Sequence, residues 1–556
     1  MKRSLLGFLA VIAAAAPAAA ADVTETVEKE LHRSFDHYSR QTPPLYFLSY
    51  SVIETEDFFA QAGGGALSES REDHGRLARV DARVGTAALD SSHPLRDSRG
   101  DWQEDPGVSV TLPVENDPLA LRSALWAQSD RAYKDAVERW GRVKSQAAVK
   151  AEEEDKSPDL SAETPETAIQ APAPLAYDRP AWEEKLRRWS APFGRAAHVL
   201  DSGVEVRLGR ESRTIVTSEG TRVIVQKPFA FLILWAWSRA EDGMDLTRTE
   251  TFFASSPDGL PGEDVVLQAA NRMIGDLAAL RAAPLTEPYS GPAILSGRAA
   301  AVFFHEVLGH PIEGERQRRS DEAQTFAKKR GQKITSSHLS VVFDPTLSRF
   351  GQTELAGGYL YDDQGVKARP VKAVEKGIFR EFLLSRKPVA GFSQSNGHGR
   401  AEPGRTPMAR QSNLIVNSDD IVTDKKLKAL LLREVRRQKK PYGLLFDDIQ
   451  GGYTQTTRDH PNAFSVLPIL VYRVYPDGRE ELVRGVDLVG TPLSALEGVL
   501  AAGNPTGVFN GFCGAESGQI PVSAVSPSLL FSNIEVQRRK SSEQRPPLLP
   551  PPEAKP

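Results

Sequence analysis

The stretch FFHEVLGHPIEGE, residues 303–315, decides how the second half of this chain is interpreted. His305 is followed directly by Glu306, and the next histidine is His310. Zinc hydrolases commonly carry two histidines at positions i and i+4 of a helix, in the pattern H-E-x-x-H. Here the second histidine stands at i+5. Five residues of a regular α-helix turn about 500°, so the two side chains would point about 140° apart.

The residues around this motif favour a local irregularity that would bring the two histidines together. The run AAAVFFHEVLGH, residues 299–310, predicts a helix that ends near Gly309 and Pro311. A π-bulge, or a helix end at Gly309, returns position i+5 to the side of position i. Glycine has no Cβ and suits such a distortion. The spacing therefore does not exclude a metal ion shared by His305 and His310; the alternative is a helix whose histidines only pack or cap.

A third ligand is the test of a metal site, because catalytic zinc usually has three protein ligands and one position left for water. The candidates are Cys513, His398, His460, Glu313 and Glu315. Cys513 is the only cysteine in the sequence, so it cannot form an internal disulfide. Its thiolate would be a strong zinc ligand, and binding would protect it from oxidation. The histidines are expected in loops, and the glutamates at the surface or behind the ligands.

Glu306 is the candidate general base, because it follows one ligand directly and lies on another face of the helix. It would take a proton from water and pass it to the leaving amine. An extended substrate would add as a strand to a sheet edge near the metal. The candidate contacts of this substrate are Gly451, Gly452, Gly518, Gln519 and His398. The alternative for the glycines is that they form plain turns, as glycine clusters often do.

The N-terminus predicts export. MKRSLLGFLAVIAAAAPAAAADVTET begins with Lys2 and Arg3, continues with an apolar run, and ends in an A-x-A site at Ala19 and Ala21. This pattern indicates a cleaved secretory signal over residues 1–21, hence a periplasmic or secreted protein. The apolar run is shorter than the roughly 20 residues that span a membrane, so no stable span is expected. A net charge of −4 gives no reason to expect a nucleic-acid partner.

Hydrophobic periodicity divides the mature chain into two domains. Residues 22–285 predict an α/β (α+β) domain, with strands in 44–55, 75–85 and 204–240 and long helices at 117–140 and 263–283. Within it, residues of about 145–180 are acidic and proline-rich, which predicts a flexible insertion.

The second domain, residues 286–540, predicts a β-rich, barrel-like fold that carries the HExxxH helix. Short strand-like runs are divided by glycine, asparagine, aspartate and proline, and one inserted helix covers 424–438. The proline-rich tail, residues 541–556, is expected to be disordered.

Four separated motifs of the second domain resemble the TldD/PmbA peptidase family. They are HEVLGHPIEGE, then the run at 361–386, then NGHGRAEPGRTPMARQSNLIV, and finally FCGAESGQIPVSAVSPSLLF. The resemblance covers residues of about 290–537 and implies one zinc ion per chain on His305, His310 and Cys513, with Glu306 as catalytic base. All four residues are present, as in the active TldD type. The family also implies a homodimer, or a heterodimer with a related subunit, acting on peptides or unfolded polypeptides. The export signal, the acidic insertion and the tail depart from the family pattern.

The sequence therefore predicts an exported zinc metallopeptidase that hydrolyses peptides or unfolded protein segments. Two alternatives remain open. One is a non-catalytic binding or scaffold protein with a closed zinc site, in which Glu313 or His398 supplies a fourth ligand. The other is a zinc hydrolase that acts on an amide outside peptides, for instance in cell-wall material.

Overall fold

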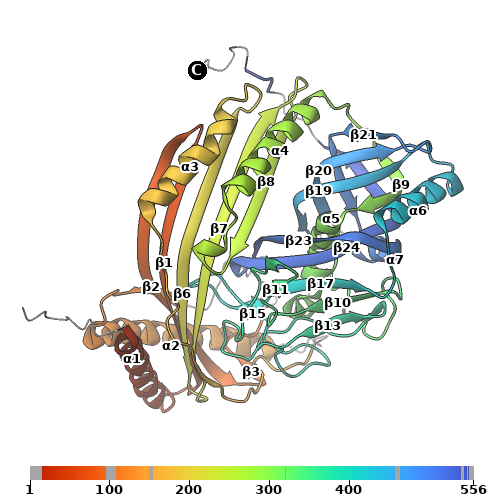
Figure 1. Ribbon diagram of the computed structural model, residues 1–556. Helices are drawn as coiled ribbons and strands as arrows, with labels where there is room; N and C mark the ends of the chain where they lie inside the picture. Colours follow the sequence, from red (N-terminus) through yellow and green to blue (C-terminus); the bar gives the residue numbers. More distant parts are fainter. Residues whose placement is uncertain are drawn as a thin grey trace, which may run out of the picture.

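The described residues form two large sheets that share no strand, as Figure 1 shows for this computed structural model. The described residues are 16–95, 108–148, 155–319, 321–457, 464–539, 544–547 and 549. The predicted signal segment up to residue 15, most of the predicted tail, and His460 lie outside them. The predicted domain boundary near residue 285 falls between the last helix of the first part and the first strand of the second.

The first part is built on an eight-stranded sheet of long antiparallel hairpins. The central strands pair in the order β2-β1-β6-β7, and β1 joins β2 through Gly64 and Gly65, both at positive φ. Such turns require φ values that glycine adopts without strain. The strands are β1 (Leu45–Gly63), β2 (Ala66–Thr86), β3 (Leu89–Asp90), β4 (Val108–Leu112), β5 (Thr167–Ile169), β6 (Asp201–Thr217), β7 (Arg222–Arg239) and β8 (Asp245–Ala254).

Four helices pack on this sheet and confirm the mixed α/β prediction. They are α1 (Ala16–Tyr38), α2 (Pro118–Ala147), α3 (Arg179–Gly194) and α4 (Glu263–Ala282). The side chain of Asp117 caps α2 by accepting a hydrogen bond from the backbone of Ala120. Helices α3 and α4 share one apolar core with β6, β7 and β8, while α1 and α2 share another with β1 and β2.

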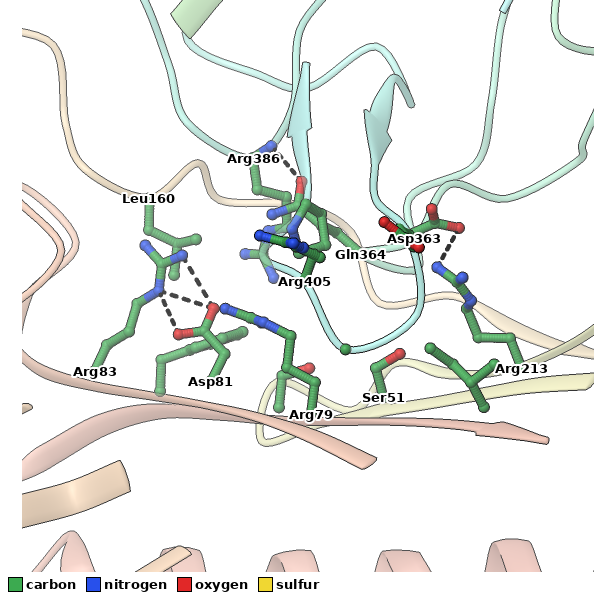
Figure 2. Close-up of a pocket in the computed structure, with 16 residues that line it drawn as sticks. Ser51, Arg79, Asp81, Arg83, Leu160, Arg213, Asp363, Gln364, Arg386 and Arg405 are labelled. Carbon is green, nitrogen blue, oxygen red and sulfur yellow. Dashed lines mark hydrogen bonds and ion pairs between the residues drawn. The ribbon is translucent and has the colours of Figure 1, made fainter. Parts of the chain in front are cut away.

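The described residues of the acidic insertion contact other parts of the chain. Leu160 is buried, and it lies beside Arg83 in the small pocket of Figure 2. Asp159 is fully buried, where it pairs with Arg318 at 2.9 Å and contacts the ring of His93 at 2.9 Å. Farther on, β5 adds to β7 as a parallel strand. These contacts join the segment to residues that are distant in the sequence. Its composition alone indicates flexibility.

The second part contains a twelve-stranded sheet, which confirms a strand-rich domain. Within it, β24, β22, β20, β19 and β9 pair successively, and β9 pairs back to β24, so these strands close a ring. The strands are β9 (Tyr289–Leu295), β10 (Leu339–Phe343), β13 (Val371–Glu375), β14 (Ile378–Phe379), β17 (Asn413–Ser418), β18 (Ile421–Val422), β19 (Gly443–Thr454), β20 (Phe464–Val474), β21 (Glu480–Val483), β22 (Val486–Gly490), β23 (Val499–Ala515) and β24 (Gly518–Arg538).

Shorter elements complete the second part. Two small ladders pair β11 (Arg349–Phe350) with β12 (Thr353–Glu354), and β15 (Gly399–Arg400) with β16 (Met408–Ala409). The helices are α5 (Gly297–Phe304), α6 (Asp424–Arg437) and α7 (Pro492–Glu497).

Helix α5 lies in the centre of the second core. All its residues except Arg298 are buried, and Phe303 packs edge-on against Phe464 and Phe531 from two strands of the ring. This packing fixes the end of α5, from which the histidine motif continues. None of the helices in the described part of the chain is both long enough and apolar enough to cross a membrane.

Candidate metal centre

The helix changes its winding at the histidine motif. Helix α5 ends at Phe304, His305–Gly309 forms a π-helical turn, and His310–Ile312 forms a 3₁₀ turn. The backbone N–H of His310 donates to the carbonyl oxygen of His305, five residues earlier. This wider turn places the two imidazole rings 5.1 Å apart, centroid to centroid. A Cβ at residue 309 would lie 2.0 Å from Gln411 Oε1, so a larger residue there would have to displace the buried Gln411 side chain.

Cys513 reaches the two histidines from strand β23. Its Sγ lies 3.4 Å from His310 Nε2, although the two residues are 203 positions apart in sequence. The ligand atoms of His305, His310 and Cys513 all lie within 4.8 Å of one another, and the three residues are buried. The structure thus brings together the three residues that the sequence proposes as ligands.

This arrangement fits a zinc ion. Imidazole nitrogen and thiolate are ligands that zinc prefers, and two such donors in a tetrahedral shell stand about 3.6 Å apart. The separation of 3.4 Å between His310 Nε2 and Cys513 Sγ is close to that value. In addition, His305 Nδ1 is buried and has no hydrogen-bond partner among the described residues. A buried polar atom without a partner is costly, so a bound cation would explain its placement.

The electrostatics of the site favour the form of cysteine that binds metals. Burial raises the pKa of the Cys513 thiol, but His310 and His305 outweigh burial and hold this pKa well below its usual value. Burial likewise lowers the pKa of His310, while Cys513 and Glu313 outweigh it and raise this pKa well above its usual value. The buried histidines therefore stabilise a thiolate, which is the nucleophilic and metal-binding form.

Glu313 orients His310 from behind the ligands. Its Oε2 lies 3.2 Å from His310 Nδ1, which leaves Nε2 directed at Cys513. Arg316 donates to the same carboxylate at 2.9 Å, and Arg410 approaches its other oxygen at 3.4 Å. Burial raises the pKa of Glu313, but His310 and Arg316 outweigh it and lower this pKa to about 2. The carboxylate is therefore ionised and committed to these partners.

Arg410, which the sequence analysis does not single out, holds the cysteine side of the site. This fully buried guanidinium donates from Nη2 to the carbonyl oxygen of Cys513 at 2.7 Å and to its Sγ at 3.3 Å. From Nη1 it donates to Ser517 Oγ at 2.8 Å and to the carbonyl oxygen of Gly518 at 3.1 Å. One side chain thus fixes both the thiolate and the turn of the hairpin that carries it.

Replacing Arg410 with Met should weaken zinc binding by about ten- to a hundredfold, the usual effect of removing a group that orients a ligand. The physical reason is the loss of the N–H groups that place the Cys513 thiolate. Zinc affinity, measured by competition with a chromogenic chelator, is the readout. Arg405→Met, at an exposed position five residues earlier, is the matched control. Equal affinities in the two variants would contradict this role.

Glu306 is positioned by the end of strand β19. Thr454 Oγ1 contacts both the carbonyl oxygen of Glu306, at 2.8 Å, and its Oε2, at 2.9 Å. Glu306 Oε2 lies 4.0 Å from His310 Nε2. The carboxylate therefore faces the ligand cluster, and Thr454 is a positioning residue that the sequence alone does not reveal.

Gly452 leaves the room that Glu306 occupies. A Cβ at residue 452 would lie 2.8 Å from Glu306 Cγ and 2.9 Å from the backbone oxygen of Ser465. The neighbouring Gly451 is different, because an added Cβ there would meet nothing within 4 Å. Of the glycines proposed as substrate contacts, Gly452 therefore also has a packing role.

Gly452→Ala should displace Glu306 and lower kcat by about a hundredfold, since a shift of about 1 Å is enough for such a loss. Zinc content should stay at the wild-type level, because no zinc ligand is touched. Gly451→Ala is the matched control and should keep wild-type kcat. Wild-type turnover in Gly452→Ala would show that the position of Glu306 does not matter.

The other sequence candidates lie away from the cluster. His398 has no exposed surface, and its ring nitrogens contact Asn396 and Ser412, so it offers nothing to a substrate or a metal here. Burial lowers the pKa of His398 to about 3, so the ring is neutral. Glu315 accepts hydrogen bonds from Ser385 and Ala409. Gly518 and Gln519 lie at the start of β24, where both approach Glu402.

Residues 288–538 match the family model of the PmbA/TldA metallopeptidase C-terminal domain. A protein named "Metalloprotease" from Methanothermobacter thermautotrophicus is 26% identical over 58% of this chain and 67% of its own length. A "Zinc metalloprotease TldD homolog" from Saccharolobus solfataricus is 24% identical over 44% of this chain and 51% of its own length. The chain thus matches about half to two thirds of the length of these relatives.

The fold also resembles a solved structure. The crystal structure of TldE from Thermococcus kodakarensis aligns with a TM-score of 0.61 at 15% identity, over 93% of this chain and 100% of that one. At this identity the likeness establishes the fold alone. The C-terminal part of the chain is therefore similar to metallopeptidases of the TldD/PmbA family.

Proposed function

We propose that this chain, whose C-terminal part matches the TldD/PmbA metallopeptidases, is an exported zinc peptidase that hydrolyses peptides or unfolded protein segments. One zinc ion per chain would be held by His305, His310 and Cys513. The observation that carries the proposal is the geometry of these buried residues, whose ligand atoms lie within 4.8 Å of one another beside the carboxylate of Glu306.

The ligand count favours an enzyme over a closed structural zinc site. A structural site would need a fourth protein ligand, and Glu313 and His398 are the sequence candidates. Glu313 is committed to His310, Arg316 and Arg410, and His398 to Asn396 and Ser412. Within the described residues, neither belongs to the cluster of ligand atoms. Three protein ligands are the usual number for catalytic zinc.

The zinc ion would polarise the scissile carbonyl group and make a water molecule nucleophilic near neutral pH. Glu306 accepts the proton of the attacking water on its carboxylate and then donates it to the nitrogen of the leaving amine. Thr454 holds this carboxylate in place while it accepts the proton and while it donates it. Glu313 keeps His310 oriented, and Arg410 holds Cys513 in place.

The substrate would lie as an extended strand along a free sheet edge. Between Gly451 and Thr454, β19 pairs with β20 on one side, while its pairing with β9 ends at Phe446. Strand β23 pairs with β24 up to Ala515, and its pairing with β18 is limited to Ala502 and Gly503. Among the described strands, both edges near the metal centre therefore have main-chain groups available for β-addition. Gly451 and Gly452 belong to the first edge.

The proposed location and assembly rest on the sequence pattern and the resemblance. The signal-like N-terminus supports a periplasmic or secreted location. A homodimer, or a heterodimer with a related subunit, is the assembly that we propose, and light scattering of the purified mature chain would test it.

Removal and return of zinc tests the proposed function. Dialysis against a chelator should abolish hydrolysis of an unstructured peptide, and about one equivalent of zinc per chain should restore it. Circular dichroism of the metal-free protein serves as a control for folding. Hydrolysis that persists without metal, or a zinc-loaded protein that cleaves no peptide, would refute the proposal.

A further inference from the structure

A large cavity separates the first sheet from the hairpin that carries Cys513. Its volume is about 870 Å³. Strands β7 and β8 line one side, and residues of the β23–β24 hairpin and of the segment 345–361 line the other. Figure 1 shows this hairpin extending from the second part toward β7.

The wall of the cavity contains a cluster of four phenylalanines contributed by both parts of the chain. The ring centroid of Phe231 lies 4.7 Å from that of Phe512, 4.9 Å from that of Phe253 and 6.3 Å from that of Phe229. Phe512 remains 45% exposed although it packs on Phe231. An aromatic ring half open to a cavity leaves apolar surface that a further apolar group would cover.

Four cationic side chains of the cavity already have polar partners, which disfavours an ionic ligand. Arg213 and Lys227 both pair with Asp363, at 2.5 and 3.1 Å. Arg207 pairs with Asp57 at 3.0 Å. Arg400 donates to the carbonyl oxygens of Gln411 and Pro521. A new anion would have to compete with these partners, whereas an apolar group would meet the phenylalanines directly.

The cavity and the metal centre lie on opposite faces of strand β23. Phe512 immediately precedes Cys513, and side chains alternate between the two faces of a strand. Phe512 therefore projects toward the cavity, while Cys513 projects toward the histidines on the opposite face. A peptide added at the free edge of β23 would alternate in the same way. Its backbone would pass the metal centre, and every second side chain would point toward the phenylalanines.

We propose that this cavity is a subsite that receives large apolar, preferably aromatic, side chains of an extended peptide substrate. This inference rests on the proposed peptidase function and adds a substrate class to it. The subsite is built by Phe229, Phe231, Phe253 and Phe512, so the first domain contributes to substrate selection. Bulky apolar residues, which are buried in folded proteins, would mark an unfolded segment.

The test measures peptide binding without cleavage. The zinc-loaded Glu306→Gln full chain is titrated with two labelled peptides that differ only at alternate positions, Phe in one and Ser in the other. Fluorescence anisotropy should show at least about tenfold tighter binding of the Phe peptide. Phe512→Ala and Phe253→Ala, each added to this background, should remove most of that preference and leave binding of the Ser peptide unchanged. Leu500→Ala is the matched control, because Leu500 is 47% exposed on the same strand and does not line the cavity.

The outcomes distinguish failure of the proposed subsite from failure of the proposed peptidase function. Equal binding of both peptides, or a preference that survives both phenylalanine substitutions, would overturn the subsite. A change of oligomeric state in Phe512→Ala with unchanged binding would also overturn it and assign the surface to a subunit contact. If the wild-type protein cleaves neither peptide but the Phe preference is present, the subsite stands and the peptidase function fails. Thermal unfolding of each variant verifies that it is folded, and Phe253→Ala provides the test if Phe512→Ala is not.

Discussion

Glu306→Gln is expected to lower peptide hydrolysis by at least about a thousandfold, near the upper end of the effect of a general acid–base residue. The amide has nearly the shape of the carboxylate and can still accept a hydrogen bond from Thr454. It cannot, however, take up a proton from water near neutral pH. The loss should appear in kcat, because the proton transfer belongs to the reaction step and not to substrate binding.

The same variant should keep its zinc and its fold. Glu306 is not one of the three clustered ligands, and the substitution preserves the volume beside Gly452. Glu535→Gln, at an exposed position on β24, is the matched control and should have wild-type activity. Two measurements, zinc content by elemental analysis and kcat on one peptide, show whether the variant loses activity while it keeps its zinc. Activity within about tenfold of the wild type would exclude Glu306 as the base.

Cys513→Ser and His310→Ala should each remove zinc from the purified protein, whereas the wild type should hold close to one zinc per chain. A serine hydroxyl does not ionise near neutral pH, so it replaces a charged ligand with a weak neutral one. The alanine leaves two protein ligands and also deprives the buried Glu313 of a partner. Hydrolysis should fall in parallel with metal content in both variants.

Metal analysis of these variants tests whether two distant segments form one site. His338→Ala is the matched control, because His338 is exposed and lies outside the cluster. Loss of zinc in both ligand variants, but not in this control, would show that His310 and Cys513 bind the same zinc ion. A wild-type zinc content in Cys513→Ser would refute this metal centre. The motif would then be a helix that contains two histidines.

Local sequence patterns were sufficient for the elements whose signals are short-range. Helices predicted at 117–140, 263–283 and 424–438 correspond to α2, α4 and α6, and Asp117, the first residue of the first range, caps α2. Caps and hydrophobic periodicity act within a few residues, so they can be read from the sequence. Helix α3 was not predicted, because Pro180 and Pro192 and its many charged residues obscure its apolar positions. Trp182, Leu186, Trp189 and Phe193 are nonetheless buried in its core.

The sequence by itself determined the chemical groups of the metal centre: two histidines with a glutamate between them, and a single cysteine. It also indicated that their spacing requires a distorted helix, because the geometry of an α-helix does not depend on the rest of the chain. Tertiary structure alone decided that Cys513 meets His310, that Arg410 and Thr454 hold the reactive groups, and that His398 is buried. It also ordered Asp159 in the acidic insertion and placed Phe231 against Phe512. These contacts join residues far apart in sequence, and their free energy depends on burial and strand register across the whole fold, which no local pattern encodes.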